Sequence, residues 1–303
     1  MAIVHNNNMG MIKSVHNYLT LIKFSHTVFA LPFALLAMIL AFREISVMSL
    51  QTLPVMTIVW IILAMVGARS GAMGFNRLVD RKWDAENPRT ANRPSATGEI
   101  SPTQMVLMIL ISFALLIYAA WKLNITAFYL SPVAIFLVCF YSYSKRFTSY
   151  SHLFLGIAIG AAPIAAWIAV TGGISPTSLI LGSSVFTWIG GFDILYALQD
   201  LDFDKKVGLH SIPVHFGVKN SLLIARGLHL ITAILWIWLA VIESLNYIFY
   251  LGVAVSCILL FLEHKLLKPN NLSGINIAFF NLNAVISIIL FITLTGDILL
   301  LPN

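Results

Sequence analysis

Two short acidic segments stand out in a chain that has only twelve Asp and Glu residues. The first reads NRLVDRKWD and contains Asn76, Asp80 and Asp84, and the second reads DLDFD and contains Asp200 and Asp204. Residues four apart lie on the same face of a helix. If both segments are helical, each would therefore project its oxygen-bearing side chains into one space.

This pattern of side chains predicts a magnesium site. Carboxylates at this spacing repel each other unless a cation lies between them. Oxygen ligands suit hard cations, and Mg²⁺ binds one or two carboxylates, keeps several waters and accepts phosphate oxygens. Two such segments that face each other would hold a diphosphate through Mg²⁺. The alternative is that these acids only solvate helix ends, but the recurrence of the spacing, with Asn76 in register, favours the metal site.

The composition is that of a polytopic membrane protein, with 59% hydrophobic residues, 10% charged residues and a mean hydropathy of +0.90. A helix needs about 20 apolar residues to cross roughly 30 Å of hydrocarbon. Nine segments reach that length, at about 20–42, 53–75, 103–121, 125–143, 152–170, 177–198, 219–242, 246–264 and 275–296. We therefore predict an all-α integral membrane fold of nine transmembrane helices around a central cavity, forming a single domain over residues 1–303.

The basic residues predict the orientation in the membrane. They gather near the N-terminus and in the loops that follow even-numbered spans, whereas the opposite loops hold little beyond Arg43 and Lys122. By the positive-inside rule, the N-terminus and both acidic segments are cytoplasmic, in a membrane of the bacterial inner type. The formal charge of +6 reflects this topology and an anionic ligand. Nucleic acid is not an expected partner, because its binders present a basic face on a soluble domain.

Two further ionisable residues lie deeper in the predicted spans. Arg69 precedes Asn76 by seven residues, and Asp193 precedes Asp200 by the same interval. Seven residues make about two helical turns, so each lies on the same face as the residue that it precedes. A single buried ionisable residue could form only a structural pair. Here, each is directed toward the expected cavity, which favours a role there.

The sequence contains three elements, in residues 76–98, 141–146 and 193–217, that together resemble the signatures of the UbiA-type aromatic prenyltransferases. Residues 76–98, NRLVDRKWDAENPRTANRPSATG, resemble the first aspartate-rich signature of that family, Asn-x-x-x-Asp-x-x-x-Asp followed by Arg-Thr-x-x-Arg-Pro. Residues 193–217, DILYALQDLDFDKKVGLHSIPVHFG, resemble the second signature. Tyr141 and Lys145 in YSYSKR match a third element, Tyr-x-x-x-Lys. The resemblance extends over essentially the whole chain and all three elements are specific.

The resemblance implies how a polyprenyl diphosphate would be bound. Magnesium would be held by the two acidic segments and would neutralise the leaving diphosphate as its bond to the allylic carbon breaks. The residues implied as ligands are Asn76, Asp80, Asp84, Asp200 and Asp204, the four aspartates also being catalytic. Lys145, Lys23 and Arg81 would bring positive charge to the same oxygens. For Lys23 the alternative is that it extends to the membrane interface.

The resemblance also implies a second substrate, a phenolic aromatic acid. The allylic cation would be sheltered by aromatic faces, for which Tyr141 and Tyr196 are preferred. The acceptor would attack through a ring carbon, with its carboxylate paired with the guanidinium of Arg69 and with Asp193 beside it. We therefore predict a Mg²⁺-dependent transfer of a polyprenyl group, with 4-hydroxybenzoate as the acceptor, in respiratory quinone biosynthesis.

Two alternatives stay open. Arg77 follows the motif asparagine where many 4-hydroxybenzoate enzymes have an acid, and LIKFSHTVFALPFALLA with NPRTANR resembles a branch found in bacteria that make menaquinone. In that branch the acceptor is a dihydroxynaphthoate. From another class, a secondary transporter also has intramembrane ionisable residues and repeated halves. Acids at cytoplasmic helix ends with basic neighbours favour phosphate binding instead, and magnesium dependence would distinguish the two classes.

Overall fold

The structure is a computed structural model that describes residues 27–45, 54–272, 274–275 and 281–301. These residues form helices and no strand, apart from one isolated bridge between Lys268 and Asn271. The helices are α2 Thr27–Glu44, α3 Val55–Glu86, α4 Pro94–Thr97, α5 Pro102–Leu123, α6 Ile125–Ser144, α7 Ser151–Thr171, α8 Pro176–Ala197, α9 Leu201–Val207, α10 Ile212–Ile242, α11 Tyr247–Leu266 and α12 Asn283–Leu300, with a 3₁₀ turn at Leu198–Asp200. The prediction of an all-α fold is confirmed.

Eight helices in the described part of the chain are long and apolar enough to cross a membrane, which supports an integral membrane protein. The first predicted span, 20–42, overlaps α2, and its residues before Thr27 lie outside the described part. The number of nine spans and the cytoplasmic N-terminus stay predictions.

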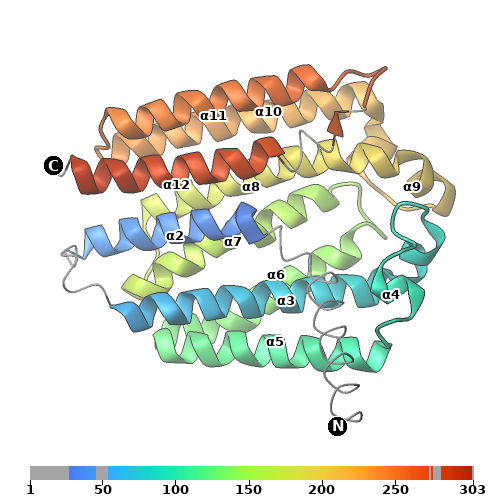
Figure 1. Cartoon of the computed structure of the whole chain (residues 1–303), viewed down its shortest axis with the longest axis horizontal. Helices are drawn as coiled ribbons and strands as arrows, with labels where there is room; N and C mark the ends of the chain where they lie inside the picture. Colours follow the sequence, from blue (N-terminus) through green and yellow to red (C-terminus); the bar gives the residue numbers. More distant parts are fainter. Residues whose placement is uncertain (1–26, 46–53, 273, 276–280, 302–303) are drawn as a thin grey trace, which may run out of the picture.

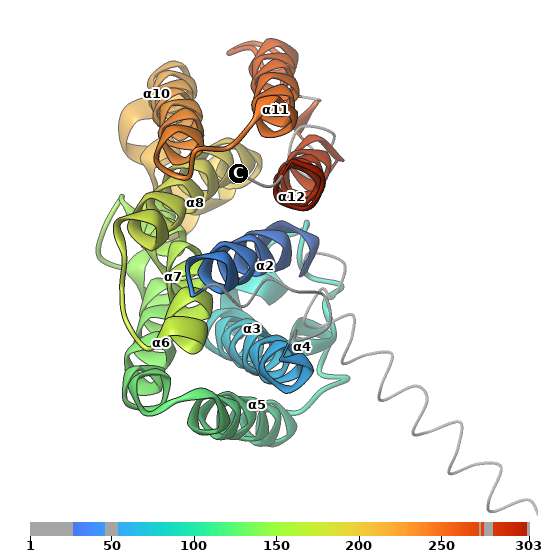
Figure 2. The same ribbon diagram turned by 90° about the vertical axis from the view of Figure 1, so that its left-hand side faces the viewer.

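The helices lie side by side along the long axis of the molecule (Figure 1). Seen end on, they follow one another around the bundle from α3 and α5 through α6, α7 and α8 to α10, α11 and α12 (Figure 2). Helix α2 lies between α7 and α12 and packs against both. It buries the side chains of Phe33, Leu36 and Leu40 in the main hydrophobic core, where the ring of Phe33 packs on Trp188 of α8.

Helix α8 is buried along most of its length and is held closely against α7. A Cβ atom added at Gly160 of α7 would lie 2.7 Å from the carbonyl oxygen of Gly182 of α8, and one added at Gly182 would lie 2.9 Å from that of Gly160. Small residues allow the backbones of membrane helices to approach in this way. Because α8 leads directly into the second acidic segment, this contact fixes the position of that segment.

Candidate active site

The first acidic segment occupies the last turns of α3. This helix has 32 residues and, at 1.5 Å per residue, a length of about 48 Å, which exceeds the thickness of the hydrocarbon layer. The helix therefore continues through the acidic segment, which is the condition for residues four apart to share one face. The amide nitrogen of Asn76 lies 2.9 Å from a carboxylate oxygen of Asp80, so these two side chains share one face.

The second acidic segment lies where α8 changes geometry. Helix α8 ends at Ala197, a 3₁₀ turn covers Leu198–Asp200, and α9 begins at Leu201. This break was not predicted from the sequence. Asp200 and Asp204 are both buried, although they follow the end of the apolar span. Buried carboxylates need partners, so each one points to a ligand or to a cation in the chain.

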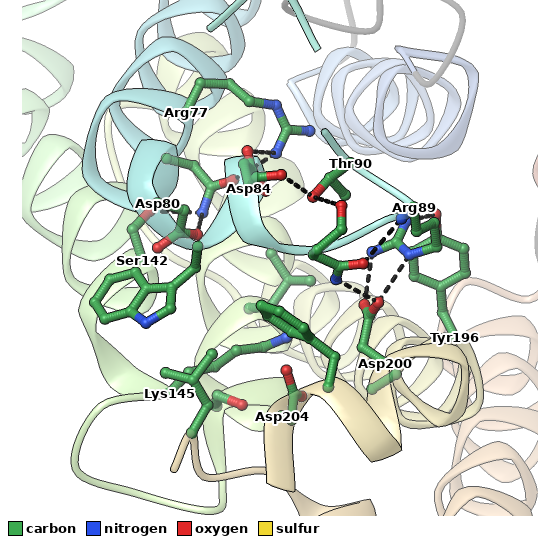
Figure 3. A pocket seen from close by; sticks show the side chains of 18 of the residues that line it. Arg77, Asp80, Asp84, Arg89, Thr90, Ser142, Lys145, Tyr196, Asp200 and Asp204 are labelled. Carbon is green, nitrogen blue, oxygen red and sulfur yellow. Dashed lines mark hydrogen bonds and ion pairs between the residues drawn. The ribbon is translucent and has the colours of Figure 1, made fainter. Parts of the chain in front are cut away.

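One cavity brings the two acidic segments together (Figure 3). Its volume is about 250 Å³, and it opens between residues of α3, α6, α7, α8 and α9. It is lined by nine of the residues predicted from the sequence: Asn76, Asp80, Asp84, Tyr141, Lys145, Asp193, Tyr196, Asp200 and Asp204. The two acidic segments that meet here, at Asp84 and at Asp200, are more than 100 positions apart in the chain. Their roles in binding and catalysis stay predictions.

Three other predicted residues lie elsewhere. Lys23 lies outside the described residues. Arg69 is not among the residues that line the cavity, because it lies one turn below Met73, the lining residue of α3 nearest to it. Arg81 is rotated by about 100° from Asp80 around the helix, and its Nε donates a hydrogen bond to the carbonyl oxygen of Ser95 at 3.1 Å. The structure therefore directs Arg81 toward the α4 segment and away from the cavity.

Two arginines that follow α3 make ion pairs with the acidic segments. Arg89 forms a bidentate pair with Asp200, with Nε 2.8 Å from Oδ1 and Nη2 2.6 Å from Oδ2. It also donates to the hydroxyl of Tyr196 at 3.0 Å (Figure 3). Nη1 of Arg93 lies 2.6 Å from Oδ1 of Asp84. Both arginines were visible in the Arg-Thr-x-x-Arg-Pro element, but sequence reasoning did not include them among the site residues.

The charges around the cavity balance. The lining residues include five cationic side chains, Arg77, Arg89, Arg93, Lys145 and Arg146, and five carboxylates, Asp80, Asp84, Asp193, Asp200 and Asp204. A prenyl diphosphate would add several negative charges to a neutral, partly buried site. Electrostatic interactions are strong in such surroundings, so the site needs further positive charge before it can hold this ligand.

The electrostatics keep the two most important cations charged. Burial disfavours the charged form of Lys145, but the surrounding carboxylates outweigh burial, so the pKa of Lys145 is raised. Burial also opposes the charge of Arg89, but its hydrogen bonds and charge interaction with Asp200 outweigh this effect and raise the pKa of Arg89. Both side chains therefore remain cationic throughout the physiological pH range.

Two carboxylate oxygens at the cavity suit a metal ion. Oδ2 of Asp84 and Oδ2 of Asp204 are buried and make no hydrogen bond to any described residue, and Oδ2 of Asp84 has an ion pair with Nη1 of Arg77 at 3.8 Å. Within the described ranges, no group of three or more His, Cys, Asp or Glu side chains could hold a metal ion by itself. Mg²⁺ commonly binds to one or two carboxylates and takes its remaining ligands from water and phosphate. The donor set therefore fits a magnesium ion that binds together with a phosphorylated ligand.

Comparison with known proteins identifies the family. Residues 30–285 match the model of the UbiA prenyltransferase family. The chain belongs to the UbiA prenyltransferase family. It is therefore a transferase, as predicted. Its relatives include proteins named 4-hydroxybenzoate octaprenyltransferase from Tolumonas auensis, 30% identical over 72% of this chain and 76% of the relative, and from Alkalilimnicola ehrlichii, 30% identical over 73% and 75%.

Solved structures of UbiA homologues share this fold. A UbiA homologue from Aeropyrum pernix K1, solved in its apo form, superposes with a TM-score of 0.80 at 28% identity, over 90% of this chain and 98% of that chain. A UbiA homologue from Archaeoglobus fulgidus bound to GPP and Mg²⁺ superposes with a TM-score of 0.68 at 23% identity, over 93% and 99%. The similarity thus extends over nearly the whole length of both solved proteins.

Proposed function

We propose that this UbiA-family protein transfers a polyprenyl group from polyprenyl diphosphate to a ring carbon of 4-hydroxybenzoate, in respiratory quinone biosynthesis. The observation that carries the proposal is the meeting of both acidic segments with Lys145 in one cavity, where two carboxylate oxygens lack hydrogen-bond partners among the described residues. The names of the relatives support 4-hydroxybenzoate as the acceptor. The inner membrane and a cytoplasmic active site belong to the same proposal.

In this proposal the two acidic segments hold the diphosphate end of the donor. Asp80 and Asp84, with Asn76, would bind magnesium from one side, and Asp200 and Asp204 from the other. When bound, the metal would stabilise the negative charge that develops on the leaving diphosphate. Because the charges of the lining side chains balance without a ligand, the metal would offset the negative charge of the diphosphate, and Lys145 would contact the phosphate oxygens.

The acceptor would lie deeper in the same cavity. Tyr141, Asp193 and Tyr196 line it, and Asp193 is about two helical turns further into the membrane than Asp200. A carboxylate on the acceptor requires a guanidinium. Of the two arginines considered in α3, Arg77 lines the cavity and is 7% exposed, whereas Arg69 does not line it. Arg77 therefore reaches the cavity where Arg69 does not, and its Nη1 lies 3.8 Å from Oδ2 of Asp84, beside the first acidic segment.

The presence of Arg77 supports a dihydroxynaphthoate as the second candidate acceptor. It stands where many 4-hydroxybenzoate enzymes have an acid, and its Nη1 lies 3.2 Å from Oδ1 of Asn76. A cation at this position changes the charge directly beside the first acidic segment. This substitution is the observation that favours a different aromatic acid.

Product analysis tests the proposed function. The purified protein in lipid would be incubated with Mg²⁺, mixed-length polyprenyl diphosphates and either 4-hydroxybenzoate or a dihydroxynaphthoate, and products would be separated by mass spectrometry. We expect prenylated 4-hydroxybenzoate. If a prenylated naphthoate is the sole product, the proposed acceptor is wrong but the proposed prenyl transfer is right. Intact donor with both acceptors would contradict the proposal and favour the transporter class.

A further inference from the structure

A fully buried histidine holds one of the carboxylates that line the cavity. His152 lies in the first turn of α7, and its Nδ1 is 2.7 Å from Oδ2 of Asp193 in α8. The side chain of His152 is 0% exposed and that of Asp193 is 20% exposed. A carboxylate only accepts hydrogen bonds, so Nδ1 of His152 carries a hydrogen atom and donates a hydrogen bond to Asp193. The pair thus has a buried donor and a carboxylate that faces the cavity.

The two helices that carry this pair are locked together by backbone contact. A Cβ atom added at Gly156 of α7 would lie 2.6 Å from the carbonyl oxygen of Phe186. One added at Gly190 of α8 would lie 3.8 Å from the carbonyl oxygen of His152. Because the ring of His152 is also 0% exposed, the atoms around it leave it little freedom to move relative to Asp193. A donor that is fixed in this way orients the carboxylate that it contacts.

The proposed reaction releases a proton that the acidic segments are poorly suited to accept. The bond between the allylic carbon and the diphosphate oxygen breaks, and its electron pair leaves with the diphosphate. The acceptor ring then forms a carbon–carbon bond to the allylic carbon. The alkylated ring carbon still carries its hydrogen, which must leave as a proton to restore aromaticity. A base beside the acceptor, away from the diphosphate, is needed for this step.

The other ionisable groups in the cavity are less suitable bases. Asp200 and Asp84 are paired with Arg89 and Arg93. Asp80 is paired with Arg146 at 3.6 Å, and Asp204 belongs to the proposed metal site. Lys145 is a cation, and the carboxylates around it raise its pKa, so it cannot accept a proton at neutral pH. Asp193 lies on α8, seven residues before Asp200 of the 3₁₀ turn that follows the helix, and is therefore about 10 Å away from it along the helix axis. Its carboxylate therefore lies deeper in the cavity than Asp200, where it also interacts with the charge of Lys145.

Resting on the proposed function, we propose that Asp193 takes the proton from the alkylated ring carbon and that His152 is the positioning residue that holds its carboxylate toward the acceptor. The step balances, because the ring loses one proton, the carboxylate gains it, and no oxidant or further reactant is required. Asp193 then returns the proton to water when the product leaves.

A kinetic isotope effect tests this assignment. The wild-type protein would be assayed with the acceptor that it uses, unlabelled and deuterated at the ring carbon that is alkylated, alongside the Asp193→Asn variant. General bases contribute roughly 10²- to 10⁴-fold to rate, so we expect Asp193→Asn to lower kcat by about 100-fold or more. Proton removal would then limit the rate, and a primary deuterium isotope effect should appear that is absent in the wild type.

Variants at His152 separate positioning from folding. His152→Leu removes the hydrogen bond to a charged group, worth about 1.5–3 kcal/mol, and should lower kcat by roughly 10- to 100-fold with the same isotope effect. His152→Gln can still donate from its amide and should recover part of the rate. The matched control is His215→Gln, an exposed histidine at the start of α10, which should retain wild-type rate and show no isotope effect.

Each outcome decides one assignment. If Asp193→Asn and His152→Leu are slow but show no isotope effect, the pair is only structural and the proton-transfer proposal is wrong. Wild-type rates in Asp193→Asn would overturn it equally. If the wild type forms no prenylated aromatic product, the proposed function itself fails and the proton-transfer role fails with it. Unfolding of each variant, measured in parallel, identifies any loss of rate that results from a damaged fold.

Discussion

Replacing Asp204 by asparagine removes one negative charge from the cavity and keeps the shape of the side chain. Asp204 is 3% exposed, and its Oδ2 makes no hydrogen bond to a described residue. If this oxygen binds the metal that stabilises the leaving diphosphate, the variant loses a preorganised electrostatic interaction. Such a loss costs about 10²- to 10³-fold in kcat, or roughly 3–4 kcal/mol. The stability should change by less than about 1 kcal/mol, because no hydrogen bond from Oδ2 is broken.

Asp200→Asn is the informative comparison, because it should reduce both activity and stability. Asp200 accepts two hydrogen bonds from Arg89 and one from Asn87. Breaking a buried ion pair costs about 3–5 kcal/mol. The side chain of Arg89 is 30% exposed, so solvent screening reduces the expected cost to roughly 1–3 kcal/mol.

The assay pairs product formation in lipid with unfolding in mixed detergent micelles for both variants. We expect kcat to be strongly reduced in both variants and only Asp200→Asn to be destabilised. A wild-type kcat in Asp204→Asn would refute its role as a metal ligand. Equal loss of stability in the two variants would refute the different pairing of these two carboxylates.

Three further predictions concern the metal, the lysine and the helix contact. Chelation of divalent cations should abolish turnover and added Mg²⁺ should restore it, and activity that persists in chelator would contradict the magnesium site. Lys145→Gln should lower kcat/KM for the donor by roughly 10- to 100-fold, because it removes a charge-assisted contact; the exposed Lys205→Gln on α9 is the control, and similar losses in both would exclude a specific role. Gly182→Ala should destabilise the protein by about 1–3 kcal/mol, because its Cβ would lie 2.6 Å from Cδ1 of Ile164. The control is Gly227→Ala, which meets no atom within 4 Å, and equal stability of the two variants in an unfolding titration would contradict the close contact of α7 and α8.

Local periodicity was sufficient to predict much of the site. The interval of four residues between Asn76 and Asp80 places them on one helix face whatever surrounds the helix, and the structure has their side chains 2.9 Å apart. Long apolar runs predicted membrane helices because the thickness of the hydrocarbon layer sets the length of a span. The similarity to one family then connected these residues with a diphosphate and magnesium.

The partners of the charged residues could not be derived from spacing. Arg89 and Asp200 are 111 residues apart, yet they form a bidentate pair. Arg69 and Arg77 both lie on α3, but only Arg77 lines the cavity. Which part of a helix face reaches a cavity depends on the crossing of its neighbours, and that information is not contained in the helix itself.

The sequence by itself determined the class of the protein, the helical spacing of its acids and its family resemblance, because each depends on composition or on residues close together in the chain. Only the tertiary structure decided that both acidic segments meet Lys145 in one cavity, that Arg81 turns away from it, and that His152 holds Asp193. These arrangements depend on how separate helices pack together. The contact between His152 and Asp193 depends on the close approach of α7 and α8, and the positions of Asp200 and Asp204 depend on the break at Leu198–Asp200.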